Sequence, residues 1–193
     1  VVLFAAGARA GYLLGGVLLA LPVGYAAIAS SPYRMRRIKA FLEPFEHRQG
    51  AGYQITESLM SFGSGGWTGV GLGDGRQKLF YLPEAHTDFI LAVLSEEFGL
   101  LGVLLMFCLY LFIAGRGLHI ASLARTTYAR LLAGSLSLTF FIYVLVNAGM
   151  VSGLLPVVGV PLPLVSYGGT SVVTLLAGFG ILMSIHGHRN FIR

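Results

Sequence analysis

The fold class of this chain is decided by residues 98–115, which read FGLLGVLLMFCLYLFIAG without a single charged side chain. A helix needs about 20 apolar residues to cross the hydrocarbon core of a bilayer. Similar uncharged runs cover about 10–30, 131–151 and 169–186. Each run is apolar all round, as a lipid-facing or bundle-core helix is. The sequence therefore predicts an all-α membrane protein, a polytopic helical bundle with four transmembrane helices.

The composition supports this class. Of the 193 residues, 55% are hydrophobic and 11% are charged, whereas a soluble globular domain carries about 25% charged residues. The single cysteine, Cys108, lies inside an apolar run, which excludes a disulfide framework. Residues 1–4 resemble the end of an earlier span. We therefore expect residues 1–193 to form the C-terminal part of one larger membrane domain.

The charge distribution predicts a topology rather than a nucleic-acid interface. All eight acidic residues lie between 31 and 98, together with seven of the thirteen Lys and Arg. The short segment 116–130 has three Arg and no acid, the tail after His186 has two Arg, and 152–165 is uncharged. Because Lys and Arg in short loops favour the cytoplasm, both chain ends are expected there. The loop of about residues 31–97 and the Pro-rich turn then face outward.

The 31–97 loop is too long for a simple connection, and such loops are usually functional or disordered. Its aromatic residues, such as Tyr53 and Trp67, argue against disorder. Residues 52–60 are partly amphipathic, which suits a helix in the membrane interface. The glycine-rich stretch 63–75 predicts a backbone full of turns. It lacks the GxxxxGK[ST] pattern between a strand and a helix, so no nucleotide is expected.

Within this loop, residues 81–90 read YLPEAHTDFI and carry the candidate chemistry. Thr87 or Asp88 would suit the N-cap of a helix that enters the second span. The functional alternative is that Asp88 is a carboxylate at the outer surface of the membrane, next to apolar walls, where it accepts a proton from a substrate. If the helix begins near Thr87, Glu96 lies on the same side as Asp88. Glu84 and His86 are neighbouring candidates or solvated loop residues.

Seven blocks give the chain a close resemblance to the SEDS family of polytopic membrane proteins (shape, elongation, division, sporulation). The blocks are FLEPF at 41–45, GYQITESL at 52–59, GSGG at 63–66, GLGDGRQKLFYLPEAHTDFI at 71–90, EEFGLLG at 96–102, NAGMVSGLLPVVGVPLPLVSYGGTS at 147–171 and GFGILMSIHGHR at 178–189. The loop block 71–90 resembles the FtsW branch of this family. The last two spans resemble the RodA branch. The resemblance covers almost the whole chain and corresponds to the last four of ten spans.

The resemblance implies a peptidoglycan glycosyltransferase of cell elongation or division, in the bacterial inner membrane, that polymerises lipid II. It maps the essential carboxylate onto Asp88, as the general base for the acceptor sugar's 4-hydroxyl. Arg76, Lys78 or a divalent cation such as Mg²⁺ would neutralise the leaving pyrophosphate. A further set of candidates for substrate contact comprises Glu84, His86, Glu96, Ser166 and Tyr167. An apolar groove between helices would hold the polyprenyl tails.

The resemblance also implies a partner, a single-span class B penicillin-binding protein. Gly102 and Gly134 in the second and third spans would allow its close approach. Asn147 and Ser152 of the third span are expected to hydrogen-bond between helices. Two other functions stay open on the residues alone: a transporter of a lipid-linked precursor, which would need polar groups near the bilayer midplane, and a scaffold, which would not need Asp88.

Overall fold

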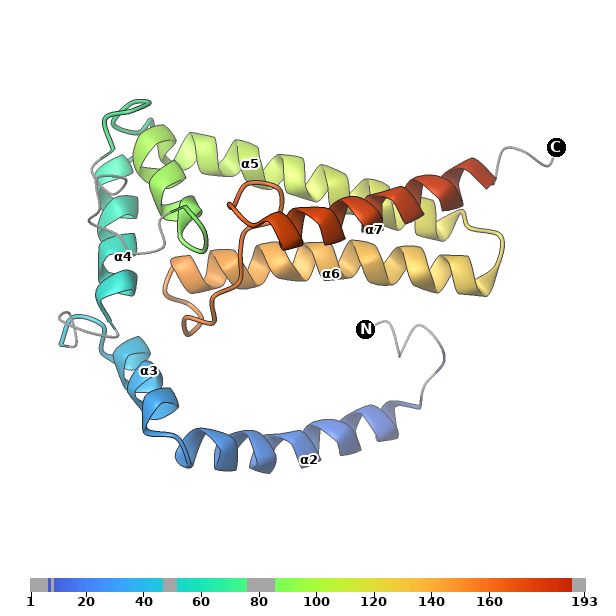
Figure 1. Cartoon of the computed structure of the whole chain (residues 1–193), viewed down its shortest axis with the longest axis horizontal. Helices are drawn as coiled ribbons and strands as arrows, with labels where there is room; N and C mark the ends of the chain where they lie inside the picture. The colour runs from blue at the N-terminus through green and yellow to red at the C-terminus, as the bar shows by residue number, and fades with distance from the viewer. Residues whose placement is uncertain (1–6, 8, 47–51, 76–85, 189–193) are drawn as a thin grey trace.

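The structure is a computed structural model that describes residue 7 and residues 9–46, 52–75 and 86–188. In these ranges it is all helical and contains no strand (Figure 1). The helices are α2 (Ala10–Ala29), α3 (Pro32–Leu42), α4 (Tyr53–Gly65), α5 (Ile90–Ser122), α6 (Thr127–Val151) and α7 (Gly169–His188). The predicted all-α class is confirmed.

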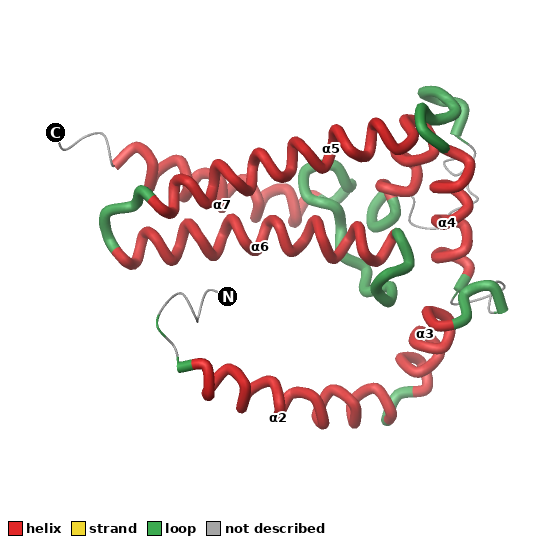
Figure 2. Tube along the Cα trace, turned by 180° about the vertical axis from the view of Figure 1, so that it is seen from behind, coloured by secondary structure: helices red, strands yellow, loops and turns green. Residues whose placement is uncertain are grey.

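Three helices of the described part are long and apolar enough to cross a membrane: Ile90–Ser122, Thr127–Val151 and Gly169–Gly187. They lie side by side in both views (Figures 1 and 2). The predicted first span folds as α2, but its apolar run over the described residues, Leu14–Ala29, is shorter. In both views α2 lies apart from the other three and connects to them through α3 and α4. The chain is thus a polytopic helical membrane protein.

The core lies between α5 and α6, with α7 packed against them. Tyr110 of α5, Phe140 of α6 and Phe179 of α7 form an aromatic column through it. The ring centroids of Tyr110 and Phe140 are 5.8 Å apart, and those of Phe140 and Phe179 are 5.6 Å apart, both edge-to-face. This arrangement suits the charge distribution of aromatic rings. The column therefore joins all three helices.

Helix α5 is broken at Gly99, whose φ of 65° and ψ of −165° are not helical. At 1.5 Å per residue, its 33 residues would measure about 50 Å, well beyond a hydrocarbon core of about 30 Å. The break divides the helix into an N-terminal piece, residues 90–98, and a spanning piece, residues 100–122. The spanning piece has 23 residues and a length of about 34 Å, which matches the core.

Helix α4 forms where an amphipathic interfacial helix was predicted, but it is packed against protein. It buries Ile55 and a row of small or polar residues, namely Thr56, Ser58, Ser61 and Gly65. The hydroxyl of Ser58 donates to the carbonyl of Val151 at the end of α6, at 2.6 Å. This face of small side chains permits close approach to the N-terminal piece of α5 and the end of α6. This docking creates an ordered layer at one end of the bundle.

The two ends of the bundle differ as the charge pattern predicts. Helices α3 and α4 lie at one end together with the loop between α6 and α7 (Figure 1). The α5–α6 turn and the C-terminal end of α7 lie at the other end, as does the first turn of α2. The arginine-bearing turn and the long loop are therefore on opposite sides.

Candidate functional site

Asp88 lies in a turn, residues 86–89, that immediately precedes α5. The N-cap of α5 is Phe89, which makes no side-chain capping bond and is buried in the core. The alternative that Thr87 or Asp88 caps the helix is therefore wrong, because the helix begins at Ile90. Buried Phe89 occupies the N-cap and anchors the turn against the core.

The carboxylate of Asp88 is half-buried and lies against the loop between α6 and α7. A Cβ atom placed on Gly159 of that loop would be 3.1 Å from Oδ2 of Asp88. Gly159 has a φ of +80°, a conformation that glycine adopts readily. The absence of a side chain at this position lets the loop backbone form one wall beside the carboxylate.

The backbone around Asp88 is held by donors from α6 and the loop before α7. The amide of Tyr167 donates to the carbonyl of His86 at 3.0 Å. The hydroxyl of Ser166 donates to the carbonyl of Thr87, and Nδ2 of Asn147 donates to the carbonyl of Asp88 at 2.8 Å. Three consecutive carbonyls are thus bound, so the turn has little freedom to move relative to the bundle.

The α6–α7 loop is itself fixed by side chains of several helices. Asn147 donates from Nδ2 to the carbonyl of Val160 at 2.7 Å. The Tyr110 hydroxyl of α5 donates to the carbonyl of Pro163 at 2.6 Å. From α3, Nη1 of Arg37 donates to the carbonyl of Val157 at 2.9 Å. Asp88 therefore faces a wall that α3, α5 and α6 hold in place.

Glu96 belongs to a different environment. It is 3% exposed, and its Oε2 lies 3.1 Å from where a Cβ atom on Gly75 would be. The expectation that Glu96 and Asp88 share a helix side depended on a helix start near Thr87, and α5 starts at Ile90. Glu96 faces the glycine-rich segment, whereas Asp88 faces Gly159. The two carboxylates therefore have separate surroundings.

The glycine-rich segment 66–71 fills the break in α5. In a continuous helix, the amides of residues 100 and 101 would bind the carbonyls of residues 96 and 97. Here the Glu96 and Glu97 carbonyls accept from the amides of Val70 and Gly71 at 2.9 and 3.2 Å. The Leu100 and Leu101 amides donate to the carbonyls of residues 66 and 67 at 2.9 and 3.1 Å. The segment thus replaces the missing helical bonds.

The remaining predicted site residues are divided between exposed, buried and undescribed positions. Arg76, Lys78 and Glu84 lie outside the described residues. The side chains of His86 and Tyr167 are exposed. Ser166 is buried, and its Oγ accepts from the Leu162 amide at 2.7 Å while donating to Thr87. The structure thus shows Ser166 fixing the loop beside Asp88. A direct substrate contact of Ser166 remains a prediction.

No group of three or more His, Cys, Asp or Glu that could hold a metal ion occurs in the described part of the chain. The divalent cation stays a prediction, since Arg76, Lys78 and Glu84 lie outside the described residues. Asp88 and Asn147 do not by themselves form a metal-ligand set.

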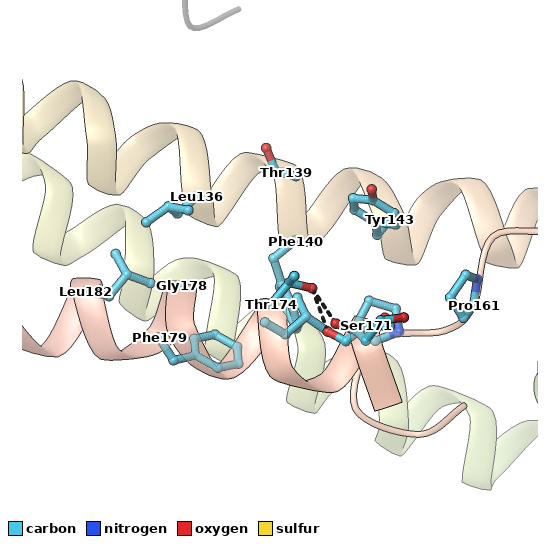
Figure 3. A pocket seen from close by; sticks show the side chains of 13 residues that line it. Leu136, Thr139, Phe140, Tyr143, Pro161, Ser171, Thr174, Gly178, Phe179 and Leu182 are labelled. Atoms are coloured by element: carbon cyan, nitrogen blue, oxygen red, sulfur yellow. Dashed lines mark hydrogen bonds between the residues drawn. The ribbon is translucent and has the colours of Figure 1, made fainter. Parts of the chain in front are cut away.

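An apolar cleft of about 430 Å³ lies between α6 and α7. Leu136, Phe140, Phe179 and Leu182 contribute to its apolar walls, and Figure 3 shows Leu136 and Leu182 at one end of it. Tyr143, Ser171 and Pro161 lie at the other end. Pro161 follows Val160, whose carbonyl Asn147 binds. The cleft therefore begins at the same loop that borders Asp88.

Comparisons with known proteins agree with this architecture. The family model described as "Cell cycle protein", FTSW_RODA_SPOVE, matches residues 1–191. The chain belongs to the FtsW/RodA/SpoVE family. It is similar to peptidoglycan glycosyltransferase MrdB of Escherichia coli K12, with 55% identity over 161 residues, 83% of this chain and 44% of MrdB.

A second relative in the FtsW/RodA/SpoVE family is a probable peptidoglycan glycosyltransferase FtsW of Geobacter metallireducens. It is 46% identical over 183 residues, 95% of this chain and 49% of that protein. A solved structure described as "Structural coordination of polymerization and crosslinking by a peptidoglycan synthase complex" matches with a TM-score of 0.80 and 30% identity. The match covers 99% of this chain and 53% of that chain. The chain thus spans about half the length of the relatives it matches.

Sequence reasoning missed how the site is held. Asn147 was assigned to helix–helix contact, but its Nδ2 binds the backbone of two non-helical segments. Ser152 donates to Gly149 of its own helix at 3.3 Å. The position of Asn147 inside the apolar run 131–151 does indicate that its amide needs hydrogen-bond partners. Only the folded chain shows that these partners are the turn at Asp88 and the loop at Val160.

Proposed function

We propose that this chain carries the catalytic carboxylate of a peptidoglycan glycosyltransferase that polymerises lipid II. The observation that supports it best is the position of Asp88: a half-buried carboxylate beside a glycine wall, in a turn fixed by three backbone carbonyl bonds. A rigidly held carboxylate suits a general base, which must lie within hydrogen-bond reach of the proton it abstracts. The family membership supports the same activity.

In the proposed reaction Asp88 accepts the proton of the acceptor sugar's 4-hydroxyl. The hydroxyl oxygen forms a bond with the anomeric carbon of the donor, and the bond from that carbon to the pyrophosphate breaks. The electron pair leaves with the pyrophosphate, which carries the undecaprenyl chain. Arg76, Lys78 or a divalent cation such as Mg²⁺ would neutralise its charge, because fixed positive charge is most effective where negative charge develops.

The cleft between α6 and α7 is proposed to receive the hydrocarbon tail of the lipid-linked substrate. Its walls are mainly apolar, it lies between two spanning helices, and it begins at the loop that borders Asp88. From Thr170 to Leu182 the cleft follows α7 for about 18 Å, at 1.5 Å per residue. A tail in the cleft would thus extend from the site into the hydrocarbon core.

The proposed location is the bacterial inner membrane, with the 31–97 loop outside and the C-terminus in the cytoplasm. A class B penicillin-binding protein is the proposed partner. The related synthase complex, which combines polymerization and crosslinking, supports a transpeptidase partner. Gly102 and Gly134, the glycines expected to contact the partner, both lie near side chains of this chain itself. A Cβ on Gly102 would overlap the Cβ of Phe98, and one on Gly134 would lie 3.9 Å from the Cβ of Ala121.

Two other functions fit the structure less well. A transporter of the lipid-linked precursor would use charged or polar groups near the bilayer midplane. Residues 100–115, 131–151 and 169–185 contain no Asp, Glu, Lys, Arg or His, and their side-chain polar groups are mainly hydroxyls and the amide of Asn147. A scaffold for a transpeptidase would not need a fixed carboxylate beside an open glycine wall. The glycosyltransferase accounts for the fixed carboxylate.

The test is polymerisation of labelled lipid II by the full-length protein with its transpeptidase partner. Asp88→Asn keeps the size of the side chain, and we expect polymer formation to fall by about 10² to 10⁴, the usual contribution of a general base. The matched control is Asp74→Asn, an exposed carboxylate of the same loop, which should stay near wild type. Wild-type polymer yield from a folded Asp88→Asn protein would disprove the proposal.

A further inference from the structure

Asn147 is a polar side chain at a fully buried position of α6. It is 0% exposed, and Val144, Met150 and Val151 around it are also 0% exposed. Burying an amide costs free energy unless hydrogen bonds compensate. A hydrophobic residue of similar size would pack more favourably at such a position, so the amide must serve another purpose.

Its two donor bonds join segments that are far apart in the sequence. One Nδ2 hydrogen is donated to the carbonyl of Asp88, 59 residues away, at 2.8 Å. The other is donated to the carbonyl of Val160, 13 residues away, at 2.7 Å. Asp88 belongs to the turn before α5, and Val160 follows Gly159, the glycine that borders the Asp88 carboxylate. One amide nitrogen therefore binds both the backbone of Asp88 and the loop that faces its carboxylate.

We propose that Asn147 is a positioning residue that sets the distance between the Asp88 carboxylate and the loop wall at Gly159. This inference rests on the proposed function of Asp88. Asn147 does not touch substrate. It acts through Asp88, because it fixes the turn at Asp88 and the loop at Val160 relative to each other. A displacement of about 1 Å at a reacting group can reduce the rate by about 10², so loss of these bonds is expected to lower kcat by about 10 to 10².

The geometry explains why asparagine suits this position. Both hydrogens of Nδ2 are used, and Oδ1 is buried without a hydrogen-bond partner in the described part of the chain. Serine has one hydroxyl hydrogen and cannot donate to both carbonyls. Ionised aspartate has no donor, and would place a carboxylate against two carbonyl oxygens. The side-chain nitrogen of asparagine supplies both bonds from one atom.

The experiment uses the full-length protein with its transpeptidase partner and measures kcat and KM for lipid II polymerisation. Asn147→Leu has a similar volume and removes both bonds. We expect its kcat to fall by about 10 to 10² while KM changes less than about threefold, at an equal amount of folded protein. The matched control is Ser137→Ala. Ser137 is also buried on α6, but its hydroxyl donates within its own helix, to the carbonyl of Ala133 at 2.8 Å. Its kcat should stay near wild type.

A second measurement separates positioning from a purely structural role. If Asn147 acts through Asp88, adding Asn147→Leu to Asp88→Asn should lower the residual rate by less than about twofold, because coupled residues are not additive. Asn147→Leu alone should also keep an acid limb in its pH–rate profile, whereas Asp88→Asn should lose that limb.

Three results would overturn the inference. The first is a wild-type kcat for folded Asn147→Leu. The second is a loss of activity that disappears when rates are normalised to folded protein. The third is a full additional loss in the Asp88→Asn background. Wild-type activity of Asp88→Asn itself would instead refute the proposed function, so the two failures are distinguishable.

Discussion

Two loops of this protein are attached to the helices by opposite means. The glycine-rich segment 66–71 pairs its backbone with the backbone of α5 at the break, and Gly69 and Gly99 permit this approach because they have no side chain. The Pro-rich loop 156–163 is attached through side chains of the helices: its carbonyls accept from Arg37, Tyr110 and Asn147, and its Val158 and Gly159 amides donate to Sδ of Met150. Proline has no backbone N–H to donate, so such a loop relies on donors from its surroundings.

The difference predicts which substitutions each loop tolerates. Backbone pairing depends on close approach, so adding even one carbon at Gly69 or Gly99 should strongly reduce the stability of the protein. Side-chain donors act one at a time, so removing one should have a moderate and local effect. The loop beside Asp88 is of the second kind, which makes its geometry sensitive to single residues on α3, α5 and α6.

The largest effect is expected for Gly99→Ala in α5. Its backbone conformation is one that only glycine adopts readily, and an added Cβ would meet the Gly69 amide nitrogen at a distance shorter than any real contact. We expect a loss of more than about 4 kcal/mol in stability, the range of severe core disruptions, seen as loss of monodisperse protein in detergent. Gly115→Ala is the control on the same helix, because nothing lies within 4 Å of the added carbon. Equal behaviour of the two variants would contradict the close-pairing account of the glycine-rich segment.

An intermediate effect is expected for Tyr110→Phe. The change removes the 2.6 Å bond to Pro163 and leaves that carbonyl buried without its donor. The expected loss of stability is about 1–3 kcal/mol, measured as a lower Tm of the purified protein. Tyr128→Phe, which removes an exposed hydroxyl on α6, should leave Tm unchanged. If both variants melt like the wild type, the loop does not depend on side-chain donors as described.

The smallest effect is expected at the cleft that begins at the Pro-rich loop. Gly178→Leu would fill the cleft, because an added Cβ there already lies 3.6 Å from Leu136. We expect KM for lipid II with its full-length tail to rise about tenfold, or about 1.4 kcal/mol. KM for a substrate with a short prenyl tail should change little. Gly180→Leu, on the same helix with nothing within 4 Å, is the control. A KM that does not depend on tail length in Gly178→Leu would exclude the tail from this cleft.

The family, the helical class and the position of the candidate carboxylate were predictable from sequence for different reasons. Long uncharged runs such as 98–115 specify helices because no other single segment satisfies its own backbone in lipid. Asp88 was identified by its motif and by its place between a polar loop and a span. Neither step required knowledge of which helices touch.

The helix start at Ile90, the break at Gly99 and the separation of Glu96 from Asp88 were not predictable in this way. Helical spacing relates two residues only when both belong to one helix, and Asp88 lies before α5. The break at Gly99 is stable because segment 66–71, distant in the sequence, supplies four backbone hydrogen bonds. A local pattern contains no information about such a partner.

The sequence by itself thus determined what this protein is made of: apolar helices, a polar loop and one carboxylate in a recognisable motif. These features follow from local chemistry, namely hydropathy, charge and residue order. The tertiary structure alone decided how that carboxylate is held, because Asn147, Ser166 and Tyr110 reach their partners across 59, 79 and 53 residues. A buried donor must find an acceptor somewhere, but only the packing of α5, α6 and the Pro-rich loop selects which one.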